Sequence, residues 1–463
     1  MQNIYNEVAS LDKRCYKQFE LSEDILMEHA ADGMADYIRS HHNDEDKIII
    51  VCGAGNNGAD GIVLARLLMI DYEVSIIMPF GVKSPMCHLQ LRRANALHVN
   101  IIDTLEPCDI IVDALFGSGF SGTFNDKTQI LLQQMNSIDA RKIACDMPSG
   151  LHLDGTLEDS SFRADITLTM GALKRGMYSD KAKEMVGEIR VLDLGISRHL
   201  YEVESSWQLL DLDDLNLPHR NAQNSHKGSY GHLSVVCGEK EGAAVITALA
   251  ALRFGAGLVT LVSNENVTIP YELMQSHFIP SNTSAIALGM GLGQEFSENE
   301  LNDFLAKESP LIIDADIFSH PMLLELLKRE ELILTPHPKE FTLLYKACGL
   351  GDISIETLQN NRFKYLEHFC ELYPDITLLL KGANVIIGKD RQFFINPHGN
   401  NILSKGGSGD VLAGMIGALL AQGITPLDAA IHASLAHTKA ALSLTCNTYA
   451  MTPNDLIESL KTL

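Results

Sequence analysis

A glycine-rich loop late in the chain has the strongest chemical signature. The segment ILSKGGSGDVLAGMIGALL places Gly406, Gly407 and Gly409 just before Asp410, at the expected start of a helix. Free N–H groups at such a helix start can bind an anion, for example a phosphoryl group in transfer. The helix dipole and neighbouring amides should keep Asp410 ionised, ready to accept a hydroxyl proton. A purely structural cap is disfavoured, because so many glycines weaken a helix start.

An earlier loop, KIIIVCGAGNNGADG, has G-x-G-x-x-G spacing over residues 53–58, between an expected strand and helix. Such glycines let the backbone approach a pyrophosphate. A conventional dehydrogenase would have a ribose-binding acid after the next strand, but VSIIMPF ends in Phe80. The turn also has polar side chains that a glycine turn with simple caps does not need: Asn56, Asn57 and Asp60. A polar ligand site is therefore favoured over a dehydrogenase cofactor site and over a plain glycine turn.

Two further polar loops follow expected strands in the same half. DIIVDALFGSGFSGT has Asp113 at the end of its strand, and KIACDMPSGLHLDG has Asp146 there, followed by a turn at Ser149. Either aspartate alone could be a helix cap or turn residue. Because ligands bind beyond the carboxyl ends of strands in open parallel sheets, the three loops are expected to converge on one site.

The elements that position these loops alternate between short apolar runs and helix-length segments. This alternation predicts an α/β protein with two doubly wound domains, each a parallel sheet covered by helices on both faces. The first half has an expected helix at 21–39 and strands at 47–52, 74–79, 109–114, 142–146, 164–170 and 188–192. The second half has expected strands at 232–237, 258–262, 311–314, 332–335, 377–381 and 385–388, and helices at 408–422 and 426–445. A polar stretch at 197–218 breaks the pattern, so we expect domains at 1–210 and 211–463.

Composition narrows the function classes. The 463 residues have a formal net charge of −23, which disfavours nucleic acid and anionic lipid as partners. No apolar run is long enough to span a membrane, and the start of the sequence lacks a signal-peptide pattern. Nine cysteines without C-x-x-C pairs or zinc spacing argue against disulfides and structural metal. A reducing cytoplasm and small-molecule partners are expected.

The segments GAGNNGADG, VDALFGSGFSG and DMPSG together resemble the NAD(P)H-hydrate epimerase domain, over roughly residues 1–200. The resemblance implies a Rossmann-like three-layer sandwich, a catalytic Asp146, and a potassium ion bound by Asn57, Asp113 and Ser149. Implied contacts to the hydrated nucleotide are Asn56, Asn57, Gly58, Ala59, Asp60, Gly117, Ser118, Gly119, Phe120, Ser121, Gly122, Thr123 and Asp146. The family usually has a second glycine where this chain has Ala59, a change that helical dihedrals tolerate and a positive φ does not.

The GGSGD motif resembles the ribokinase-like superfamily, and KGSYGHLSVVCG, GMGLG, LIIDAD, LTPHPKEF and KGANVII resemble its NAD(P)H-hydrate dehydratase branch, over about residues 225–463. The resemblance implies magnesium and ADP as phosphoryl donor, although composition and spacing do not separate ADP from ATP. Implied nucleotide contacts are Lys381, Gly382, Ala383, Asn384, Val385, Lys405, Gly406, Gly407, Ser408 and Gly409. Implied substrate contacts are Ala243, Gly291, His337 and Asp410, and CGEKEGAA is more charged than the family pattern.

Several assignments stay open from the residues alone. His337 between two prolines could be a stiff turn residue, and Glu340 could cap the next helix or help to position magnesium, as could Asp314 and Asp316. The favoured function is a bifunctional enzyme that epimerises NADH and NADPH hydrates and dehydrates the S form, in an assembly of several copies. Alternatives are a ribokinase-like small-molecule kinase with an N-terminal nucleotide-binding or regulatory domain, and an N-terminal half that binds ligand without epimerase activity.

Overall fold

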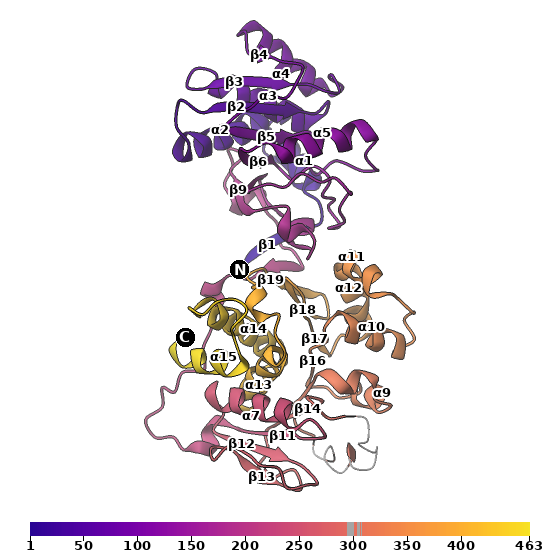
Figure 1. Cartoon of the computed structure of the whole chain (residues 1–463). Coiled ribbons are helices and arrows are strands. Elements are labelled where there is room, and N and C mark those ends of the chain that lie inside the picture. The colour runs from indigo at the N-terminus through magenta and orange to yellow at the C-terminus, as the bar shows by residue number, and fades with distance from the viewer. Residues whose placement is uncertain (294–300, 303–305, 307) are drawn as a thin grey trace. The chain divides into compact units, whose positions relative to one another are not determined.

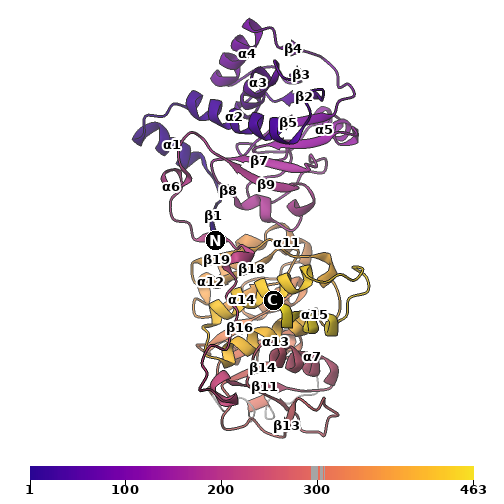
Figure 2. The same ribbon diagram turned by 90° about the vertical axis from the view of Figure 1, so that its left-hand side faces the viewer.

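The chain forms two compact units in a computed structural model that describes residues 1–293, 301, 302, 306 and 308–463. One unit is Asn3–Ser205, and the other is Ser206–Leu463 together with Met1–Gln2. Each unit is built around a largely parallel sheet with helices on both of its faces (Figures 1 and 2). This confirms the α/β class and the two doubly wound sheets that the alternating pattern predicts.

The N-terminal unit has a seven-stranded parallel sheet in the order β4-β3-β2-β5-β6-β7-β9. Its strands are β2 (Lys47–Cys52), β3 (Glu73–Ile77), β4 (Asn100–Ile101), β5 (Ile110–Ala114), β6 (Arg141–Cys145), β7 (Ile166–Met170) and β9 (Glu188–Leu192). The chain runs outward from β2 to one edge and then returns to β5 on the other side. This is the Rossmann-like order, with a crevice between β2 and β5 where the strand order reverses.

The two faces of this sheet are buried against different helices. In β2, Ile48 and Ile50 belong to one apolar cluster and Ile49 and Val51 to another, because alternate residues of a strand point to opposite faces. The first cluster contains residues of α2 (Glu23–His41), α3 (Asn56–Leu68) and α4 (Pro85–Ala96), and the second contains residues of α5 (Asp126–Ser137). The three layers are those of the predicted sandwich.

Short elements lie beside this sheet. They are β1 (Gln2–Tyr5), which pairs with β8 (Leu173–Lys174), the helices α1 (Ala9–Gln18) and α6 (Arg198–Tyr201), and the 3-10 turns η1 (Arg175–Tyr178) and η2 (Ala182–Glu184). The polar stretch expected at 197–218 is not wholly irregular, since it contains α6 and the strand β10 (Trp207–Leu209). The expectation missed both because each is only one turn or three residues long.

The C-terminal unit has a sheet in the order β13-β12-β11-β14-β15-β16-β17-β18-β19-β10, parallel as far as β17 and then antiparallel through β19. The strands are β11 (His232–Val236), β12 (Leu258–Val262), β13 (Met274–Ser276), β14 (Ala285–Leu288), β15 (Leu311–Ile313), β16 (Leu332–Leu334), β17 (Thr377–Leu380), β18 (Val385–Lys389) and β19 (Gln392–Asn396). The expected strand list lacked β14, which is central but only four residues long.

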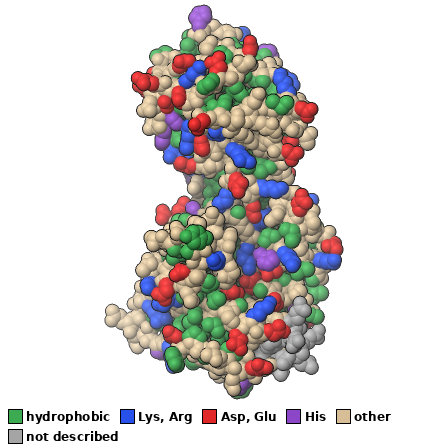
Figure 3. Space-filling model, viewed as in Figure 1, with side chains coloured by type: hydrophobic (Ala, Val, Ile, Leu, Met, Phe, Trp, Pro, Cys, Tyr) green, Lys and Arg blue, Asp and Glu red, His purple; other side chains and the backbone are tan. Residues whose placement is uncertain are grey.

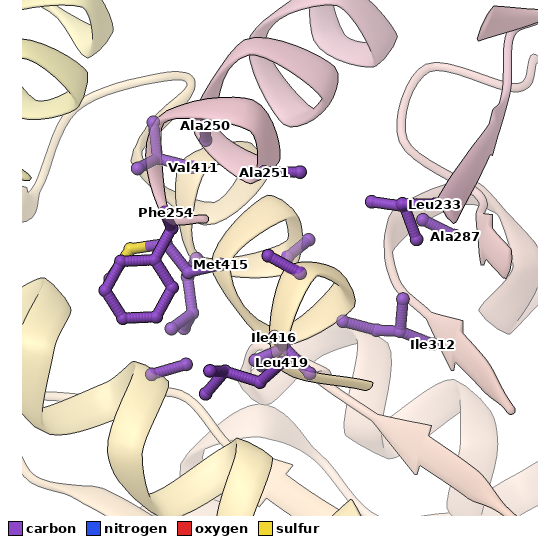
Figure 4. Packing of buried hydrophobic residues seen from close by; sticks show 14 of the residues in the cluster. Leu233, Ala250, Ala251, Phe254, Ala287, Ile312, Val411, Met415, Ile416 and Leu419 are labelled. Carbon is purple, nitrogen blue, oxygen red and sulfur yellow. The ribbon is translucent and has the colours of Figure 1, made fainter. Parts of the chain in front are cut away.

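One face of this sheet is covered by α7 (Glu241–Arg253), α13 (Ser408–Ala421), α14 (Pro426–Leu442) and α15 (Pro453–Ser459). Figure 4 shows Met415 of α13 beside Phe254 at the end of α7, with Leu233, Ala287 and Ile312 of the sheet on the other side of α13. The remaining helical elements are α9 (Leu323–Leu326), α10 (Pro338–Ala347), α11 (Ile355–Asn360), α12 (Arg362–Leu372), η3 (Leu212–Asp214), η4 (Lys227–Tyr230), η5 (Ala315–Ser319), η6 (Asn401–Leu403) and η7 (Leu460–Thr462).

The surface and the thiols fit the composition. On the face shown in Figure 3, basic and acidic side chains are interspersed. All nine cysteines carry free thiols, and only Cys446 is exposed. Within the described residues, no helix combines the length and the apolar character needed to cross a membrane.

Candidate functional site

The β2–α3 turn is packed so closely that a side chain on either of two of its glycines would force the neighbouring backbone to move. The register pairs Cys52 with Ala114, and this places Gly53 against Leu115. A Cβ atom on Gly53 would lie 1.9 Å from the Leu115 carbonyl oxygen, and one on Gly58 would lie 1.8 Å from the Gly53 carbonyl oxygen. Gly55 has open space around it, so a ligand can approach its backbone.

These loops surround a pocket of about 750 Å³ beyond the carboxyl ends of β2, β5 and β6. The predicted residues that line it are Asn56, Asn57, Asp60, Gly117, Ser118, Gly119, Phe120, Ser121 and Asp146. Gly58, Ala59, Gly122 and Thr123 do not line it, contrary to expectation. Gly58 and Ala59 are buried within α3 instead. A larger groove of about 1120 Å³ along α5 contains none of the predicted site residues.

Ala59 lies inside α3, fully buried in the apolar cluster that contains α2. Its N–H donates to the Gly55 carbonyl at 3.1 Å, which is the first hydrogen bond of this helix. Ala59 is not among the non-glycine residues with positive φ. The methyl group therefore fits the backbone, and the substitution gives no structural reason to expect an inactive N-terminal unit.

Asp146 has a specific charged partner that sequence reasoning missed. The Lys174 ammonium group is fully buried, 2.7 Å from Asp146 Oδ1, and donates to Thr169 Oγ1 at 2.7 Å. The Ser118 N–H donates to Asp146 Oδ2 at 3.0 Å. Burial alone would raise the pKa of Asp146, but Lys174 and these hydrogen bonds outweigh it and lower that pKa. The only sequence signal was a lysine within the mostly apolar run TLTMGALKRGM.

The Asp146 backbone also differs from expectation. The strand expected at 142–146 ends at Cys145, and Asp146 adopts a left-handed φ of 69°. Such a φ is uncommon for a residue with a side chain and costs free energy unless its surroundings hold it. The Asp146 N–H donates to the Leu168 carbonyl at 2.9 Å, which helps to hold this turn in place.

Asp113 and Ser149 meet directly, as predicted. Ser149 Oγ donates to Asp113 Oδ1 at 2.7 Å, and the Ser149 N–H donates to Asp113 Oδ2, also at 2.7 Å. Complete burial raises the pKa of Asp113 to about 6, despite these hydrogen bonds. Asn57 is the other predicted member, and its buried Oδ1 and Nδ2 atoms have no hydrogen-bond partner among the described residues. A buried carboxylate and an orphaned amide oxygen are a donor set that suits a monovalent cation.

Asp60 also faces this pocket. Burial, followed by the charges of Asp146 and Asp12, raises its pKa well above the ordinary value. Its carboxyl group has no hydrogen-bond partner among the described residues. The pocket therefore combines an ionised Asp146 with a carboxyl group that holds its proton more tightly, a contrast typical of sites that transfer protons.

In the C-terminal unit, the GGSGD segment forms the start of α13. Gly407 is the N-cap with φ 92°, and a Cβ atom there would lie 2.4 Å from Pro453 Cγ, so only glycine fits. A Cβ atom on Gly409 would lie 3.5 Å from Lys381 Nζ and 3.9 Å from Asp314 Oδ2. The structure thus brings the glycine loop together with Lys381, as expected for one nucleotide site.

Lys381 is surrounded by acids. Its Nζ atom is 2.8 Å from Asp314 Oδ1 and 3.9 Å from Glu340 Oε2. Burial and the Asp314 carboxylate raise the pKa of Glu340 to about 7. Among the described residues no cluster of three or more histidine, cysteine or acidic side chains has metal-site geometry. Mg²⁺ needs only one or two carboxylates when nucleotide phosphates supply its other ligands.

The Asp410 carboxylate lies in the first turn of α13, as predicted, but the groups that set its pKa differ from those expected. Burial and the charge of Asp314 raise the pKa of Asp410 to about 6, and Lys381 offsets only part of this rise. The expected stabilisation by loop amides is missing, since no described hydrogen bond reaches its carboxylate. At neutral pH the group is still mostly ionised and can act as a base.

His337 has the structural role that its flanking prolines suggested. Its Nδ1 atom accepts the N–H groups of Lys339 at 3.1 Å and Glu340 at 3.3 Å, and Glu340 Oε2 accepts the His337 N–H at 2.8 Å. This capping box begins α10. The Nε2 atom of the half-exposed ring lies 3.2 Å from Glu340 Oε1, so both ring nitrogens face groups of the same helix start.

Ala243 and Gly291 are neighbours, although CGEKEGAA is unusually charged. A Cβ atom on Gly291 would lie 3.0 Å from Ala243 Cβ, and the Lys240 N–H donates to the Gly291 carbonyl at 2.9 Å. The nearby Gly293 N–H donates to Asp316 Oδ2 at 2.9 Å. Lys240 Nζ lies 3.9 Å from the same Asp316 oxygen, so the loops that carry Lys240 and Gly293 meet at Asp316.

Two buried residues that sequence reasoning missed position the nucleotide loops. Arg362 of α12 donates to the carbonyls of Asn384 at 3.0 Å and Lys381 at 3.0 Å, and so holds the 381–385 turn. His437 of α14 lies 3.0 Å from the Ser408 carbonyl, and because that oxygen can only accept, His437 Nε2 carries the proton. Neither residue belongs to a recognisable motif, so only the tertiary contacts reveal them.

Comparisons with known proteins divide the chain in the same way. A family model described as NAD(P)H-hydrate dehydratase matches residues 233–462, and one described as YjeF-related protein N-terminus matches residues 23–176. A solved structure of ADP/ATP-dependent NAD(P)H-hydrate dehydratase from Bacillus subtilis, co-crystallised with ATP and Mg²⁺, is 29% identical, with a TM-score of 0.45. It covers 53% of this chain and 92% of its own.

Relatives match both units at once. The chain is 42% identical over 474 residues to the bifunctional NAD(P)H-hydrate repair enzyme Nnr of Helicobacter pylori, with 100% of both chains covered. The enzyme of the same name from Coxiella burnetii is 34% identical, covering 91% of this chain and 90% of its own. The Escherichia coli relative is 31% identical over 94% of this chain and 88% of its own.

Proposed function

The chain belongs to the family of bifunctional NAD(P)H-hydrate repair enzymes, and we propose that it restores hydrated NADH and NADPH in two reactions, one in each unit. We assign epimerisation of the R and S hydrates to residues 1–210 and dehydration of the S hydrate to residues 211–463. The observation that carries the proposal is that each unit presents an aspartate at a polar, glycine-rich loop with a lysine nearby: Asp146 with Lys174, and Asp410 with Lys381.

Epimerisation requires reversible opening or loss of the C6 hydroxyl group. Asp146, held ionised by Lys174, is the base that takes the proton from this hydroxyl. The open backbone at Gly55 and the Gly117–Ser121 loop bind the nucleotide, and Asn56 and Asp60 contact the hydrated ring. Re-closure on the other face of the carbon yields the second epimer, so that hydrate of either configuration becomes usable.

Asn57, Asp113 and Ser149 would hold a potassium ion in this unit. The fit rests on the orphaned Asn57 oxygen and on the buried Asp113 carboxylate, which has no basic partner among the described residues. A bound cation supplies the positive charge that this carboxylate lacks. Because Ser149 follows Asp146 by three residues, the same turn positions both the ion and the base.

In the C-terminal unit, Asp410 takes the proton from the C6 hydroxyl, whose oxygen attacks the terminal phosphorus of the nucleotide. With ADP as donor, the bond to AMP breaks and a C6 phosphate ester forms. The ring nitrogen then expels phosphate, and loss of a C5 proton completes the dihydronicotinamide ring. The Gly406–Gly409 amides stabilise the transferring charge, and Lys381 lies beside them. Magnesium would neutralise phosphate charge between Asp314, Glu340 and the nucleotide.

Absorbance assays on separated R and S forms of NADPH hydrate test both assignments. With magnesium and either ADP or ATP, NADPH should form from the S hydrate and disappear in Asp410→Asn. NADPH should also form from the R hydrate through the epimerase unit, and Asp146→Asn should abolish only this route. Nucleotide consumption on another alcohol without NADPH formation would instead support a small-molecule kinase. Conversion of the S form alone would indicate an inactive N-terminal unit.

The partners that we infer are small molecules, namely the two hydrates, ADP, magnesium and potassium. The acidic net charge of −23 supports this restriction, as it disfavours polyanionic partners. We further propose a cytoplasmic homo-oligomer. Light scattering on the purified full chain measures its mass, and the mass of a single 50.8 kDa chain would contradict the oligomer.

A further inference from the structure

A third acidic group lines the epimerase pocket, from a helix that carries none of the glycine-rich loops. Asp12 of α1 lines the pocket together with Asp60 and Asp146. It belongs to neither glycine-rich loop and to none of the motifs that identify this unit. Its position requires explanation, because a half-buried carboxyl group beside two buried ones raises the electrostatic cost of the pocket.

A hydrogen bond from a buried tyrosine holds the Asp12 side chain in place. Tyr201 of α6, which is almost fully buried, donates its hydroxyl to Asp12 Oδ1 at 2.8 Å. Gly171 makes room for this ring: its φ is 71°, and a Cβ atom there would lie 2.6 Å from the Tyr201 ring. The other carboxylate oxygen of Asp12 has no hydrogen-bond partner among the described residues, and so it is available to a ligand.

The helices that carry this pair are fastened to each other. Arg14 of α1 donates to the Leu200 carbonyl and to the carbonyls of Tyr201 at 2.7 Å and Glu202 at 3.2 Å. Apolar contacts among Val8, Leu11 and Tyr201 complete the packing. Asp12 is therefore fixed at the pocket wall, on elements different from those that hold Asp146.

The charges around Asp12 favour a protonated carboxyl group more than those around Asp146 do. Burial raises the pKa of Asp12, while the Tyr201 hydrogen bond and Lys174 lower it, and Asp146 and Glu23 raise it. Tyr16 and Asp60 also interact electrostatically with this group. Lys174 is 2.7 Å from Asp146 Oδ1, whereas it acts on Asp12 only through its charge, so Asp146 receives most of its stabilisation.

We propose that Asp12 is the second proton-transfer residue of the epimerase, acting as the acid that complements Asp146, with Tyr201 as its positioning residue. This inference rests on the proposed function of the N-terminal unit. It assigns the two proton transfers of epimerisation to two walls of one pocket.

The reaction then balances without any co-reactant. Asp146 takes the C6 hydroxyl proton, the C6–N1 bond breaks to give a C6 aldehyde, and Asp12 delivers a proton to N1. Rotation about C5–C6 presents the opposite face of the aldehyde. N1 attacks this face and returns its proton to Asp12, while the new hydroxyl regains its proton from Asp146. Both carboxyl groups end in their starting states.

The test uses Asp12→Asn in the full chain. An asparagine oxygen can still accept the Tyr201 hydroxyl, so the fold and the pocket shape should persist while proton donation is lost. We expect the R-to-S turnover number to fall about 100-fold, the size of a general-acid contribution, with little change in KM. Dehydration of the S form in the same sample should not change. Asp36→Asn, an exposed acid of α2, is the matched control.

The outcomes separate the inference from the proposed function. If the unmodified protein does not interconvert the hydrates, the proposed epimerase is wrong. If it does, and Asp146→Asn is inactive while Asp12→Asn stays within threefold of the unmodified rate, the role of Asp12 is wrong. Tyr201→Phe decides the matter if Asp12→Asn does not fold. Loss of its hydrogen bond should raise the pKa of Asp12 and move the alkaline limb of turnover to higher pH, and an unmoved limb would overturn the inference.

Discussion

The two units place an aspartate near a lysine in opposite electrostatic arrangements. Lys174 is committed to Asp146 at 2.7 Å, and the pKa of Asp146 is lowered although burial alone would raise it. Lys381 is shared between Asp314 and Glu340, and burial with the Asp314 charge raises the pKa of Asp410 to about 6. The proposed epimerase base is thus ionised before the substrate arrives, whereas acidic groups outnumber the lysine at the proposed dehydratase site.

This difference follows from the chemistry assigned to each unit. An epimerase moves protons within a single neutral ring, so its ion pair can be complete within the protein. A phosphoryl-transfer site must accept a nucleotide with its magnesium ion, and surplus carboxylates there are balanced only when the cation binds. The contrast predicts that removal of the lysine destabilises the first unit more than the second.

The largest expected effect is on turnover in the second unit. Asp410→Asn removes the proposed base at the start of α13 without changing the size of the side chain, and should slow dehydration of the S hydrate by about 10³-fold. Formation of NADPH from the S form measures this rate. R-to-S conversion, followed by chromatography of the hydrates in the same sample, should stay within twofold. Equal losses in both reactions would show that the two sites are not chemically independent.

Lys174→Met should destabilise the first unit strongly. It leaves Asp146 buried without its cation, a change that costs about 3–5 kcal/mol when one partner of a buried pair is removed. Amide hydrogen exchange, measured in each unit at increasing urea concentration, reports this loss. Amides of β6 and β7 should exchange faster than in the unmodified protein, and amides of α13 should exchange at an unchanged rate. Lys381→Met, the matched change in the second unit, should cost less, because Lys381 is partly exposed and relieves an acidic cluster only in part. Equal costs would contradict the comparison.

Much of this arrangement could be predicted from the sequence, because local patterns specify it. The glycine spacing of residues 53–58 and 406–409 and the apolar alternation along the strands each depend on near neighbours. The strand order reverses between β2 and β5, and the loops at the carboxyl ends of the neighbouring strands then meet. This brings Asp113 beside Ser149.

The remaining site residues depend on contacts that no local pattern encodes. Asp12 meets Tyr201 across 189 residues, and Arg362 reaches the Asn384 carbonyl from a helix with no motif. The rise in the pKa of Asp410 was missed for the same reason. Helix-dipole reasoning considers only α13, whereas burial and Asp314, which approaches from the end of β15, determine the pKa.

The pH dependence of the two reactions compares Asp410 with Asp146, and the expected change in rate is smaller than in the variants above. Asp410 acts as a base only when ionised, so the kcat/KM of dehydration should fall as pH decreases through about 6 and be about tenfold lower at pH 5. Epimerisation should keep its rate over this range, because the pKa of Asp146 is lowered. Samples returned from pH 5 to pH 7.5 should regain full activity, which excludes unfolding. A flat dehydration profile down to pH 5 would show that the free enzyme does not use Asp410 as its base.

The smallest expected effect concerns Ala59, the one departure from the family pattern in the first loop. Because Ala59 is buried inside α3 and its N–H begins the helical hydrogen bonds, glycine there removes a methyl contact and loosens the helix. Ala59→Gly should destabilise the first unit by about 1 kcal/mol and leave epimerisation within twofold. Urea midpoints and R-to-S rates measure the two quantities. A large gain in rate would show that the methyl group restricts the active site, and that a helical backbone alone does not make the substitution neutral.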